Sequence, residues 1–371
     1  MSARLLVADS ERDANLLYAT RMFVPDPFIW LAVRGTSYVV MSDLEIDRAR
    51  KQATVDRVLS YTHYHHRLKR RGAREPGFGD VLDSVLRDFR IRRVEVPTSF
   101  PIGLAKKLRG VRIAVKPDPF FPEREIKTPS EVARLAAAMR LSEEGMRAAV
   151  NALRRSRIGR DGLLYHRQRK LTAEDVRGVV NTTLASLGGM AGGTLVACGN
   201  QGCDPHEPGH GALRAHTTII IDIFPRDTRT GYFGDITRTV VRGRASDAVK
   251  KMYATVGAAQ ELAFQKLRAG VNGKEVHLAI QKLFADAGYK TGRVRGRMQG
   301  FFHGTGHGLG LEVHERPRVS TVSETLRAGH VVTVEPGLYY WGVGGVRLED
   351  VAVIGGRRSR NLTRFPKQLE I

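Results

Sequence analysis

Residues 301–315 read Phe-Phe-His-Gly-Thr-Gly-His-Gly-Leu-Gly-Leu-Glu-Val-His-Glu, and three of them, His303, His307 and His314, are histidines. The spacing of four between the first two would suit one face of a helix. Glycine at every second position argues against a helix, because each glycine costs a helix interior about 1 kcal/mol relative to alanine. Alternating glycines favour an extended strand that another group approaches closely. Since neutral imidazole binds metals and carries protons near neutral pH, the stretch predicts a functional site rather than a turn with incidental histidines.

A hydrophobic run and a strand that follows it each carry an aspartate. Asp222 lies in Ile-Ile-Ile-Asp-Ile-Phe at residues 219–224, and Asp235 begins the run Asp-Ile-Thr-Arg-Thr-Val-Val. A bare carboxylate in so apolar a run costs several kcal/mol to bury, so it must be paired, protonated or bound to metal. With a turn at residues 228–231, a symmetric hairpin would place the aspartates opposite each other, their Cβ atoms about 5 Å apart. Two like charges that close repel unless cations join them.

A second strand pair repeats the arrangement with two glutamates. Glu335 follows Val-Val-Thr-Val and precedes Pro-Gly, and Glu349 lies in Val-Arg-Leu-Glu-Asp-Val. Salt bridges to Arg238 or Arg347 would explain one carboxylate pair, but two pairs and a histidine cluster only awkwardly. Four carboxylates and one histidine suit two divalent cations, with Mn²⁺ fitting the oxygen-rich set and Co²⁺ or Zn²⁺ as alternatives. Two cations about 3.5–4 Å apart can bridge one hydroxide and polarise a carbonyl, which is metal-assisted hydrolysis.

In chain order, these elements resemble the signature of the pita-bread metallopeptidases, family M24, which includes methionine aminopeptidase, Xaa-Pro aminopeptidase and prolidase. That family carries an Asp in a strand, an Asp before Ile-Thr-Arg-Thr, a His in His-Gly-x-Gly-His, a Glu before Pro-Gly and a Glu in Arg-Leu-Glu-Asp. The matching residues are Asp222, Asp235, His307, Glu335 and Glu349. The resemblance covers roughly residues 128–371. Segments 308–315 and 15–20 resemble the proline-directed and creatinase-like branch.

The resemblance implies roles for the five residues and for several others. The five would be metal ligands, and Glu335 would also act as general base. His206, in Asp-Pro-His-Glu-Pro, would contact the substrate or its leaving group. His314 would bind the substrate carbonyl and stabilise the tetrahedral intermediate. His303 would stand beside the ligands or the substrate.

The implied activity is hydrolysis of Xaa-Pro peptide bonds by a dinuclear metal centre through a metal-bridging hydroxide, as an aminopeptidase or a dipeptidase. Such bonds need a dedicated enzyme, because proline's tertiary amide has no N–H and its ring fixes φ. Arg347 would orient a carboxylate of the substrate or simply pair with Glu349. A peptide substrate and a homodimer are implied as partners.

Two departures from the family pattern concern the first carboxylate pair. The family usually places its two aspartates eleven apart with glycine two residues after the first. Here they are thirteen apart and Phe224 takes the glycine's place. The extra residues, 226–229, add charge near the site and are expected to alter substrate access rather than the metal centre.

The predicted fold is an α/β amino-terminal domain, residues 1–124, followed by an α+β pita-bread catalytic domain, residues 125–371. The first shows strands at 4–8, 28–33, 37–41, 93–96 and 111–115 and helices at 44–68 and 80–89. A proline-rich linker, 116–122, precedes a helix that starts at Thr128 with Pro129 and Glu131. Later helices are expected at 171–188, 246–269 and 274–287, and strands at 217–224, 232–241, 331–334 and 346–354. Two helix pairs would back one curved, mostly antiparallel sheet in pseudo-twofold order.

The formal net charge of +22 over 371 residues is the unusual feature of the composition. It allows a nucleic-acid partner, although the arginines are spread over most of the chain and the clusters at 63–74 and 290–297 lack interleaved aromatics. We therefore keep two alternatives: a pita-bread protein that binds nucleic acid or protein through its basic surface, and a creatinase-like C–N hydrolase. Two cysteines, Cys198 and Cys203, imply no disulfide framework and a reducing cytoplasm. No apolar run suits a membrane helix or signal peptide.

Overall fold

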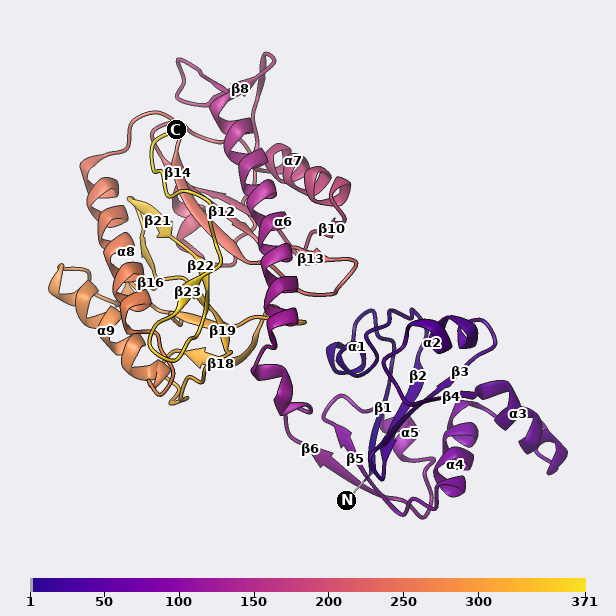
Figure 1. Cartoon of the computed structure of the whole chain (residues 1–371). Helices are drawn as coiled ribbons and strands as arrows, with labels where there is room; N and C mark the ends of the chain where they lie inside the picture. The colour runs from indigo at the N-terminus through magenta and orange to yellow at the C-terminus, as the bar shows by residue number, and fades with distance from the viewer. Residues whose placement is uncertain (1–2) are drawn as a thin grey trace. The chain divides into compact units, whose positions relative to one another are not determined.

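The structure is a computed structural model that describes residues 3–371, so residues 1–2 of the predicted first domain lie outside it. Its internal contacts divide the chain into two compact units, one ending at Arg124 and one beginning at Glu125 (Figure 1). Each unit contains its own clusters of buried apolar side chains. None of the helices in residues 3–371 combines the length and apolar character needed to cross a bilayer.

Within the described residues, the first unit is a sheet of order β4-β3-β2-β1-β5-β6 with short helices around it. The β1–β2 and β2–β3 pairs are antiparallel, and the β3–β4, β1–β5 and β5–β6 pairs are parallel. The strands are β1 (Ala3–Ala8), β2 (Phe28–Val33), β3 (Thr36–Met41), β4 (Arg57–Ser60), β5 (Arg93–Pro97) and β6 (Arg112–Lys116). The helices are α1 (Ala14–Thr20), α2 (Ile46–Gln52), α3 (Tyr61–Arg70), α4 (Phe78–Asp88) and α5 (Ile102–Ala105).

The single helix predicted over residues 44–68 is wrong, because strand β4 separates α2 from α3. Val55 and Val58 are β-branched, which lowers helix propensity and favours a strand. Strand β4 then gains a parallel partner in β3, with Val58 opposite Val39. Ser60 starts the next helix as its cap, since its hydroxyl accepts a hydrogen bond from the His63 N–H at 3.1 Å.

The second unit begins with helix α6 (Pro129–Arg154), which starts where the sequence predicts. Thr128 and Glu131 form a reciprocal capping box, and proline occupies the first helical position. Helix α7 (Ala173–Ser186) packs beside α6, and both contact an antiparallel sheet of order β11-β12-β14. Its strands are β11 (Leu195–Cys198), β12 (Thr218–Ile223) and β14 (Ile236–Val241).

The second half of this unit repeats the order of two helices followed by carboxylate-bearing strands. Helices α8 (Asp247–Lys266) and α9 (Gly273–Asp286) precede an antiparallel sheet of order β18-β17-β19-β22-β23 and a hairpin, β20–β21 (Figure 1). The strands are β17 (Gly306–Gly308), β18 (Glu315–Val319), β19 (Val331–Val334), β20 (Gly337–Tyr340), β21 (Gly344–Arg347), β22 (Asp350–Val353) and β23 (Arg360–Asn361).

Two sequence predictions about this sheet are wrong. The one curved sheet is divided into separate ladders. They are linked by single bonds, such as the one from the Glu349 N–H to the Thr237 carbonyl at 3.0 Å. The strand predicted over 346–354 is two strands, β21 and β22, because the chain leaves one ladder for the other at Leu348. Glu349 lies at this break, between the two strands.

Short elements that the sequence did not predict decorate the second unit. They are β7 (Arg157–Ile158), β8 (Leu164–His166), β9 (Arg169–Lys170), β10 (Gly189–Met190), β13 (Arg226–Asp227), β15 (Gly292–Val294), β16 (Arg297–Gln299) and the 3₁₀ turns η1 (Pro122–Glu125) and η2 (Gly199–Cys203). Strands β7, β8 and β9 form one small sheet, and β10–β13 and β15–β16 form two-stranded pairs.

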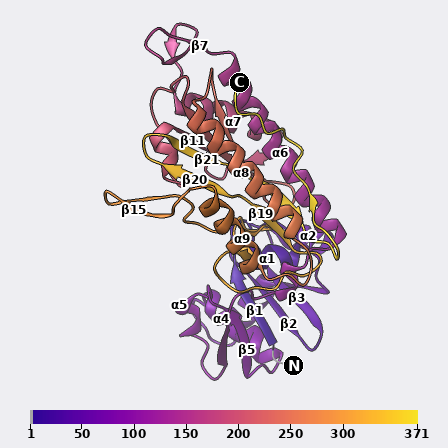
Figure 2. The ribbon, with the colours of Figure 1, turned by 90° about the vertical axis from the view of Figure 1, so that its left-hand side faces the viewer.

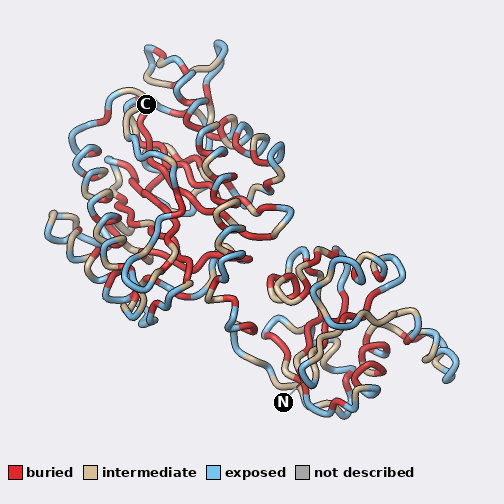
Figure 3. The backbone as a smooth tube through the Cα atoms, in the orientation of Figure 1, coloured by how far each residue is buried: buried red, intermediate tan, exposed pale blue. Residues whose placement is uncertain are grey.

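Buried residues gather in the interior of the second unit, with exposed segments around them (Figure 3). All residues of β12, β14 and β19 are buried. The extended segment predicted from the alternating glycines is short, covering only Gly306–Gly308. Its glycines are nonetheless required for close approach: a Cβ on Gly306 would lie 1.9 Å from the Thr333 carbonyl oxygen, and one on Gly308 would lie 2.2 Å from that of Arg316.

Candidate metal centre

A cavity of about 1080 Å³ in the second unit brings together every residue that the sequence predicts for the site. Its lining includes Asp222, Asp235, His307, Glu335, Glu349, His206, His303, His314 and Arg347. The apolar part of the wall is formed by Leu195, Phe224, Phe302, Val313 and Val322. The cavity therefore combines polar and charged groups with apolar surface that a ligand can contact.

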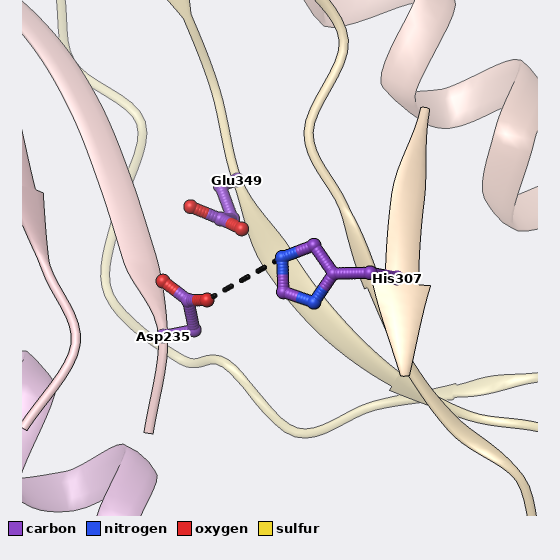
Figure 4. A group of neighbouring side chains, drawn as sticks. All are labelled: Asp235, His307 and Glu349. Carbon is purple, nitrogen blue, oxygen red and sulfur yellow. Dashed lines mark ion pairs between the residues drawn. The ribbon is translucent and has the colours of Figure 1, made fainter. Parts of the chain in front are cut away.

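Asp235, His307 and Glu349 form the tightest part of the site (Figure 4). One ligand atom from each lies within 4.8 Å of the others, and all three side chains are buried. They come from three separate strands: Asp235 directly precedes β14, His307 is the middle residue of β17, and Glu349 directly precedes β22. Residues more than a hundred positions apart in sequence therefore converge on one point.

The orientation of the His307 ring is set by the backbone. Its Nδ1 lies 3.1 Å from the Gly308 carbonyl oxygen, so Nδ1 carries the proton and donates it there. Its Nε2 faces carboxylates, 3.8 Å from Asp235 Oδ2 and 3.5 Å from Glu335 Oε1. Burial, with a contribution from the neighbouring His314, lowers the pKa of His307 to about 3, so the ring is neutral at physiological pH. An unprotonated Nε2 among carboxylates is the form that binds a metal ion.

The two aspartates do not lie directly opposite each other, which corrects the sequence prediction. Asp222 pairs with Thr237, and Ile223 pairs with Ile236. Continuing this register places Asp235 opposite Phe224, so the aspartates are diagonal neighbours on one face of the ladder. The ladder is centred between residues 229 and 230, the middle of the predicted turn, whereas the two aspartates are centred between residues 228 and 229, so the expected pairing was out by one step.

Asp222 is instead held by donors of its own chain. Arg347 Nη2 lies 2.7 Å from Asp222 Oδ2, and the Thr237 hydroxyl lies 3.0 Å from Asp222 Oδ1. The ion-pair alternative is therefore correct for this one carboxylate, whereas a pairing of Arg347 with Glu349 is not the observed contact. The guanidinium of Arg238 forms its ion pair with Asp350, at 2.8 Å, and not with a carboxylate of the site.

The two glutamates face each other across neighbouring strands. Val331 pairs with Val353 and Val334 with Asp350, so one further step of the same register places Glu335 opposite Glu349. Their backbones are held by other strands: the Glu335 N–H donates to the Thr305 carbonyl at 2.8 Å, and the Glu349 N–H donates to Thr237. The predicted second carboxylate pair is thus formed as a cross-strand pair.

The crowded carboxylates strongly perturb one another's ionisation. Burial, together with the charges of Asp222 and Glu335, raises the pKa of Asp235 well above its usual range. Burial, together with Asp235 and Glu335, does the same to the pKa of Glu349. Burial also raises the pKa of Glu335 to about 7. Such buried carboxylates need protons, hydrogen bonds or cations to offset their repulsion.

This donor set fits divalent metal ions. Four carboxylates and one neutral imidazole supply the oxygen-rich coordination that hard and borderline divalent cations prefer. Asp235, His307 and Glu349 would hold one ion within their cluster, and Asp222 and Glu335 extend the set on either side. The chemistry of the donors and their mutual repulsion both point to bound cations, since Arg347 neutralises only one of the four carboxylates.

His303 belongs to a hydrogen-bonded chain beside the cluster. Its Nδ1 lies 2.8 Å from the Gly304 carbonyl oxygen, and its Nε2 lies 2.8 Å from the Tyr339 hydroxyl. Arg347 Nη1 in turn donates to that hydroxyl at 3.2 Å. Burial lowers the pKa of His303 to about 3, and the positive charge of Arg347 contributes. A neutral His303 with a fixed tautomer therefore connects the guanidinium to the cavity wall.

His314 and His206 also line the cavity. The His314 ring lies edge-on to His307, with ring centroids 4.4 Å apart and planes at 86°. Partial desolvation lowers the pKa of His314, with Arg318 and His206 contributing. His206 is exposed at the end of the turn after η2. Both rings can reach a ligand in the cavity, which is the position that the sequence predicts for them.

Three further residues of the site were missed by sequence reasoning. Thr237 bridges the two halves, with its hydroxyl 3.0 Å from Asp222 Oδ1 and 2.7 Å from Glu349 Oε2. Tyr339 lies between His303 and Arg347, and burial raises its pKa to about 12. Arg318 lines the cavity, opposite His307 in the β17–β18 register. The signal for Thr237 was its position two residues after Asp235, on the same strand face.

The residues inserted between the aspartates do not line the cavity, contrary to expectation. Strand β13 turns away to pair with β10, and the Asp227 side chain is buried there, accepting the Arg229 N–H at 2.9 Å. Phe224, in the place of the family glycine, does line the cavity. It packs over a two-glycine turn, since a Cβ on Gly192 would lie 2.8 Å from its ring.

Comparison with known protein families agrees with this geometry. The pattern of metallopeptidase family M24 matches residues 133–355, well over half of the chain. The chain belongs to metallopeptidase family M24. The matched range includes all five candidate ligands, and the predicted pita-bread relationship is confirmed.

Several relatives within family M24 have names that refer to Xaa-Pro peptides. An Xaa-Pro dipeptidase of Pyrococcus horikoshii is 29% identical over 285 residues, covering 75% of each chain. An uncharacterized peptidase of Bacillus subtilis, YqhT, is 44% identical over 142 residues, 38% of each chain. The crystal structure of an X-Pro aminopeptidase from Thermotoga maritima has the same fold, with a TM-score of 0.82 over 100% of this chain and 98% of that one, at 23% identity. The likeness includes the amino-terminal unit.

Proposed function

We propose that this family M24 protein hydrolyses the peptide bond before proline with two bound divalent ions. The observation that carries the proposal is the meeting of Asp235, His307 and Glu349 in one cavity with Asp222 and Glu335. The names of its relatives, an Xaa-Pro dipeptidase and an X-Pro aminopeptidase, favour this substrate class. Mn²⁺ fits the oxygen-rich donor set best.

Divalent ions held by these five residues would polarise the scissile carbonyl and lower the pKa of a bound water. The protein's own groups supply the proton transfers. Glu335, which lines the cavity beside His307, would accept a proton from the attacking water and return it to the departing nitrogen of proline. This return matters because the amide nitrogen leaves only once it is protonated. Glu335 would therefore serve as both base and acid within one turnover.

The histidines would bind the substrate rather than the metal. His314 projects from the loop beside His307 and can donate a hydrogen bond to the oxygen that gains charge at the scissile carbon. His206, at the exposed rim, would contact the leaving side of the substrate. His303 and Arg347 would form the wall behind the reacting groups, connected through Tyr339. The apolar wall with Phe224 and Phe302 would receive the proline ring.

Arg318 favours short substrates. Its side chain lines the cavity, is exposed, and has no side-chain hydrogen bond or ion pair among residues 3–371. A guanidinium in that position would bind the free carboxylate of a dipeptide through charge-assisted hydrogen bonds. We therefore propose Xaa-Pro dipeptides as better substrates than longer peptides. Arg316, on the same strand but paired with Glu324, provides a matched control.

The experiment compares hydrolysis of Ala-Pro, Ala-Ala and Ala-Pro-Ala by the Mn²⁺-loaded protein. We expect Ala-Pro to be cleaved fastest and Ala-Ala hardly at all. Arg318→Gln should raise KM for Ala-Pro roughly tenfold or more, the value of a charged hydrogen bond, and affect Ala-Pro-Ala less. Arg316→Gln should change neither. Equal cleavage of Ala-Ala would contradict the proline specificity. Equal effects of both variants would contradict the role of Arg318 only.

The assembly and location are also proposals. A homodimer follows from the family resemblance. A cytoplasmic location is supported by Cys198 and Cys203, which form no disulfide in the structure. Size-exclusion chromatography with light scattering tests the first, and fractionation of cells expressing the tagged chain tests the second.

A further inference from the structure

A basic hairpin lies apart from the metal centre in the second unit. Residues 154–170 contain seven arginines and lysines and one aspartate, a net charge of +6 in seventeen residues. They comprise the end of α6 and the small sheet β7–β8–β9, which projects beside the C-terminal end of that helix (Figures 1 and 2). We name residues 154–170 the basic hairpin. The basic clusters noted from sequence, at 63–74 and 290–297, do not include it.

The basic hairpin borders a groove of its own. A cavity of about 590 Å³ lies between it and helices α6 and α7, lined among others by Asn151, Arg155, His166, Arg167, Arg169 and Asp175. Arg155, Arg167 and Arg169 are exposed. The one carboxylate in the lining, Asp175, is already paired with Arg169 at 3.0 Å. The remaining arginines therefore give the groove an excess of positive charge.

Several cations of the basic hairpin make no side-chain hydrogen bond or ion pair with the residues that the structure describes, although Lys170 lies near enough to Asp161 to lower the pKa of that carboxyl. Arg155, Arg160, Arg167 and Lys170 make no side-chain hydrogen bond or ion pair among residues 3–371. The hairpin's only acid, Asp161, accepts hydrogen bonds from the Tyr165 hydroxyl and the Leu163 N–H. Uncompensated cations repel one another, and a bound polyanion would relieve that repulsion.

The turn of the hairpin adds a second, independent observation. Arg167 and Gln168 have φ angles of 46° and 67°, so both lie in the left-handed region. A two-residue hairpin turn of this kind favours Asn-Gly, because most side chains are strained there. The chain nevertheless places an arginine at the tip, where it lines the groove. The turn thus adopts an unfavourable backbone conformation with a cation at its tip.

We propose that the basic hairpin and its groove bind the phosphate backbone of nucleic acid. A single small anion would engage the groove but leave the outlying cations, such as Arg160 and Lys170, without a ligand. A phosphodiester chain carries charges at regular spacing and can engage the groove and the hairpin together. The site needs no residue of the metal centre, so the interaction is independent of the proposed peptidase function.

The test measures binding of the full chain to a short fluorescein-labelled DNA duplex of arbitrary sequence, by fluorescence anisotropy. Binding should weaken steeply between about 50 and about 200 mM salt, because counterions are released from the phosphates. Arg155→Gln with Arg167→Gln should weaken it on the order of tenfold or more at about 0.1 M salt and lower the salt slope by about 1.8, two phosphate contacts. Lysine at both positions should restore most of the affinity.

The matched control is Arg293→Gln with Arg295→Gln, on the β15–β16 hairpin, which Figure 2 shows extending from another side of the same unit. It removes the same net charge, and both arginines are exposed. We expect it to bind the duplex nearly as the wild type does. Both double variants should keep wild-type peptidase activity and melting temperature.

Three results would overturn the proposal. The first is no binding at low salt. The second is equal weakening by the two double variants, which would mean that bulk charge alone attracts DNA. The third is displacement of the duplex by inorganic phosphate at the same phosphate concentration, which would mean a small-anion site.

Discussion

The guanidinium of Arg347 lies 2.7 Å from the carboxylate of Asp222, and both groups are buried in the wall of the metal-site cavity. Burial alone would lower the pKa of Arg347, but the neighbouring Tyr339, Asp222 and glutamates outweigh burial and raise the pKa, so the guanidinium stays charged. Of the four site carboxylates, one is thus neutralised by the chain itself. The other three depend on protons or cations.

Arg347→Met is therefore expected to destabilise the metal-free protein by about 3–5 kcal/mol, because it leaves the buried Asp222 charge without its partner. Added Mn²⁺ should recover part of the loss by binding that carboxylate. Chemical denaturation with and without Mn²⁺ measures both effects. Arg357→Met, at an exposed arginine, should change stability by no more than about 0.5 kcal/mol. An equal loss of stability in the two variants would show that the buried ion pair contributes no more to stability than an exposed arginine does.

A buried ion pair also fixes the loop that carries His314. Lys127 Nζ lies 2.6 Å from Glu315 Oε2, and the Glu315 carboxylate accepts the Leu311 N–H at 3.0 Å. Lys127→Met should free this loop and lower kcat roughly a hundredfold, as expected when a catalytic group is misplaced by about 1 Å. Metal affinity should stay unchanged. Steady-state kinetics and calorimetry separate the two, with the exposed Lys274→Met as control. Weakened metal binding would refute this division of roles.

The close approach at Gly306 gives a stability prediction. A Cβ there would lie 1.9 Å from the Thr333 carbonyl oxygen, so strands β17 and β19 must separate. Gly306→Ala should destabilise the protein by about 3 kcal/mol or more. Gly257→Ala, in helix α8 with open space around its Cβ, should instead stabilise it by up to about 1 kcal/mol. Thermal unfolding measures both, and a neutral Gly306→Ala would contradict the packing described.

Metal affinity should depend on pH with a definite sign. The pKa values of Asp235 and Glu349 are raised well above their usual range, and that of Glu335 is about 7, so the metal-free site holds protons near neutrality. Metal binding must release them. Mn²⁺ affinity should therefore fall as pH drops, and the proton on Glu335 contributes its share of that loss near pH 7. Calorimetry in two buffers of different ionisation enthalpy counts the protons released. Metal uptake without proton release would contradict the assigned protonation.

The sequence predicted the site better than it predicted the sheet. All nine candidate residues line one cavity, because each motif combines a special backbone requirement with a functional side chain. The alternating glycines are an example, since Gly306 and Gly308 leave room for neighbouring carbonyls. The local pattern is preserved in the fold because a residue with a side chain would clash at these positions.

The errors arose where tertiary pairing overrides local preference. Residues 44–68 have helical periodicity, but β3 offers residues 57–60 a parallel partner. Asp222 lies opposite Thr237 because the hairpin is centred between residues 229 and 230, one step away from the pairing expected for the two aspartates. Arg347 was expected either to orient a carboxylate or to pair with Glu349, its neighbour in sequence, whereas its ion pair is with Asp222 on another strand. The turn that presents Arg167 was equally invisible, because Arg-Gln is an unusual pair for it.

The most direct test of the metal centre is turnover of Ala-Pro by metal-stripped protein to which Mn²⁺, Co²⁺ or Zn²⁺ is returned. Asp235→Asn serves as the comparison, because it removes a ligand together with a charge that its neighbours already repel, and so should leave the fold intact. We predict activity only after metal is added, saturation at two ions per chain and no activity in the variant. Hydrolysis without metal, or at the wild-type rate in Asp235→Asn, would contradict the account.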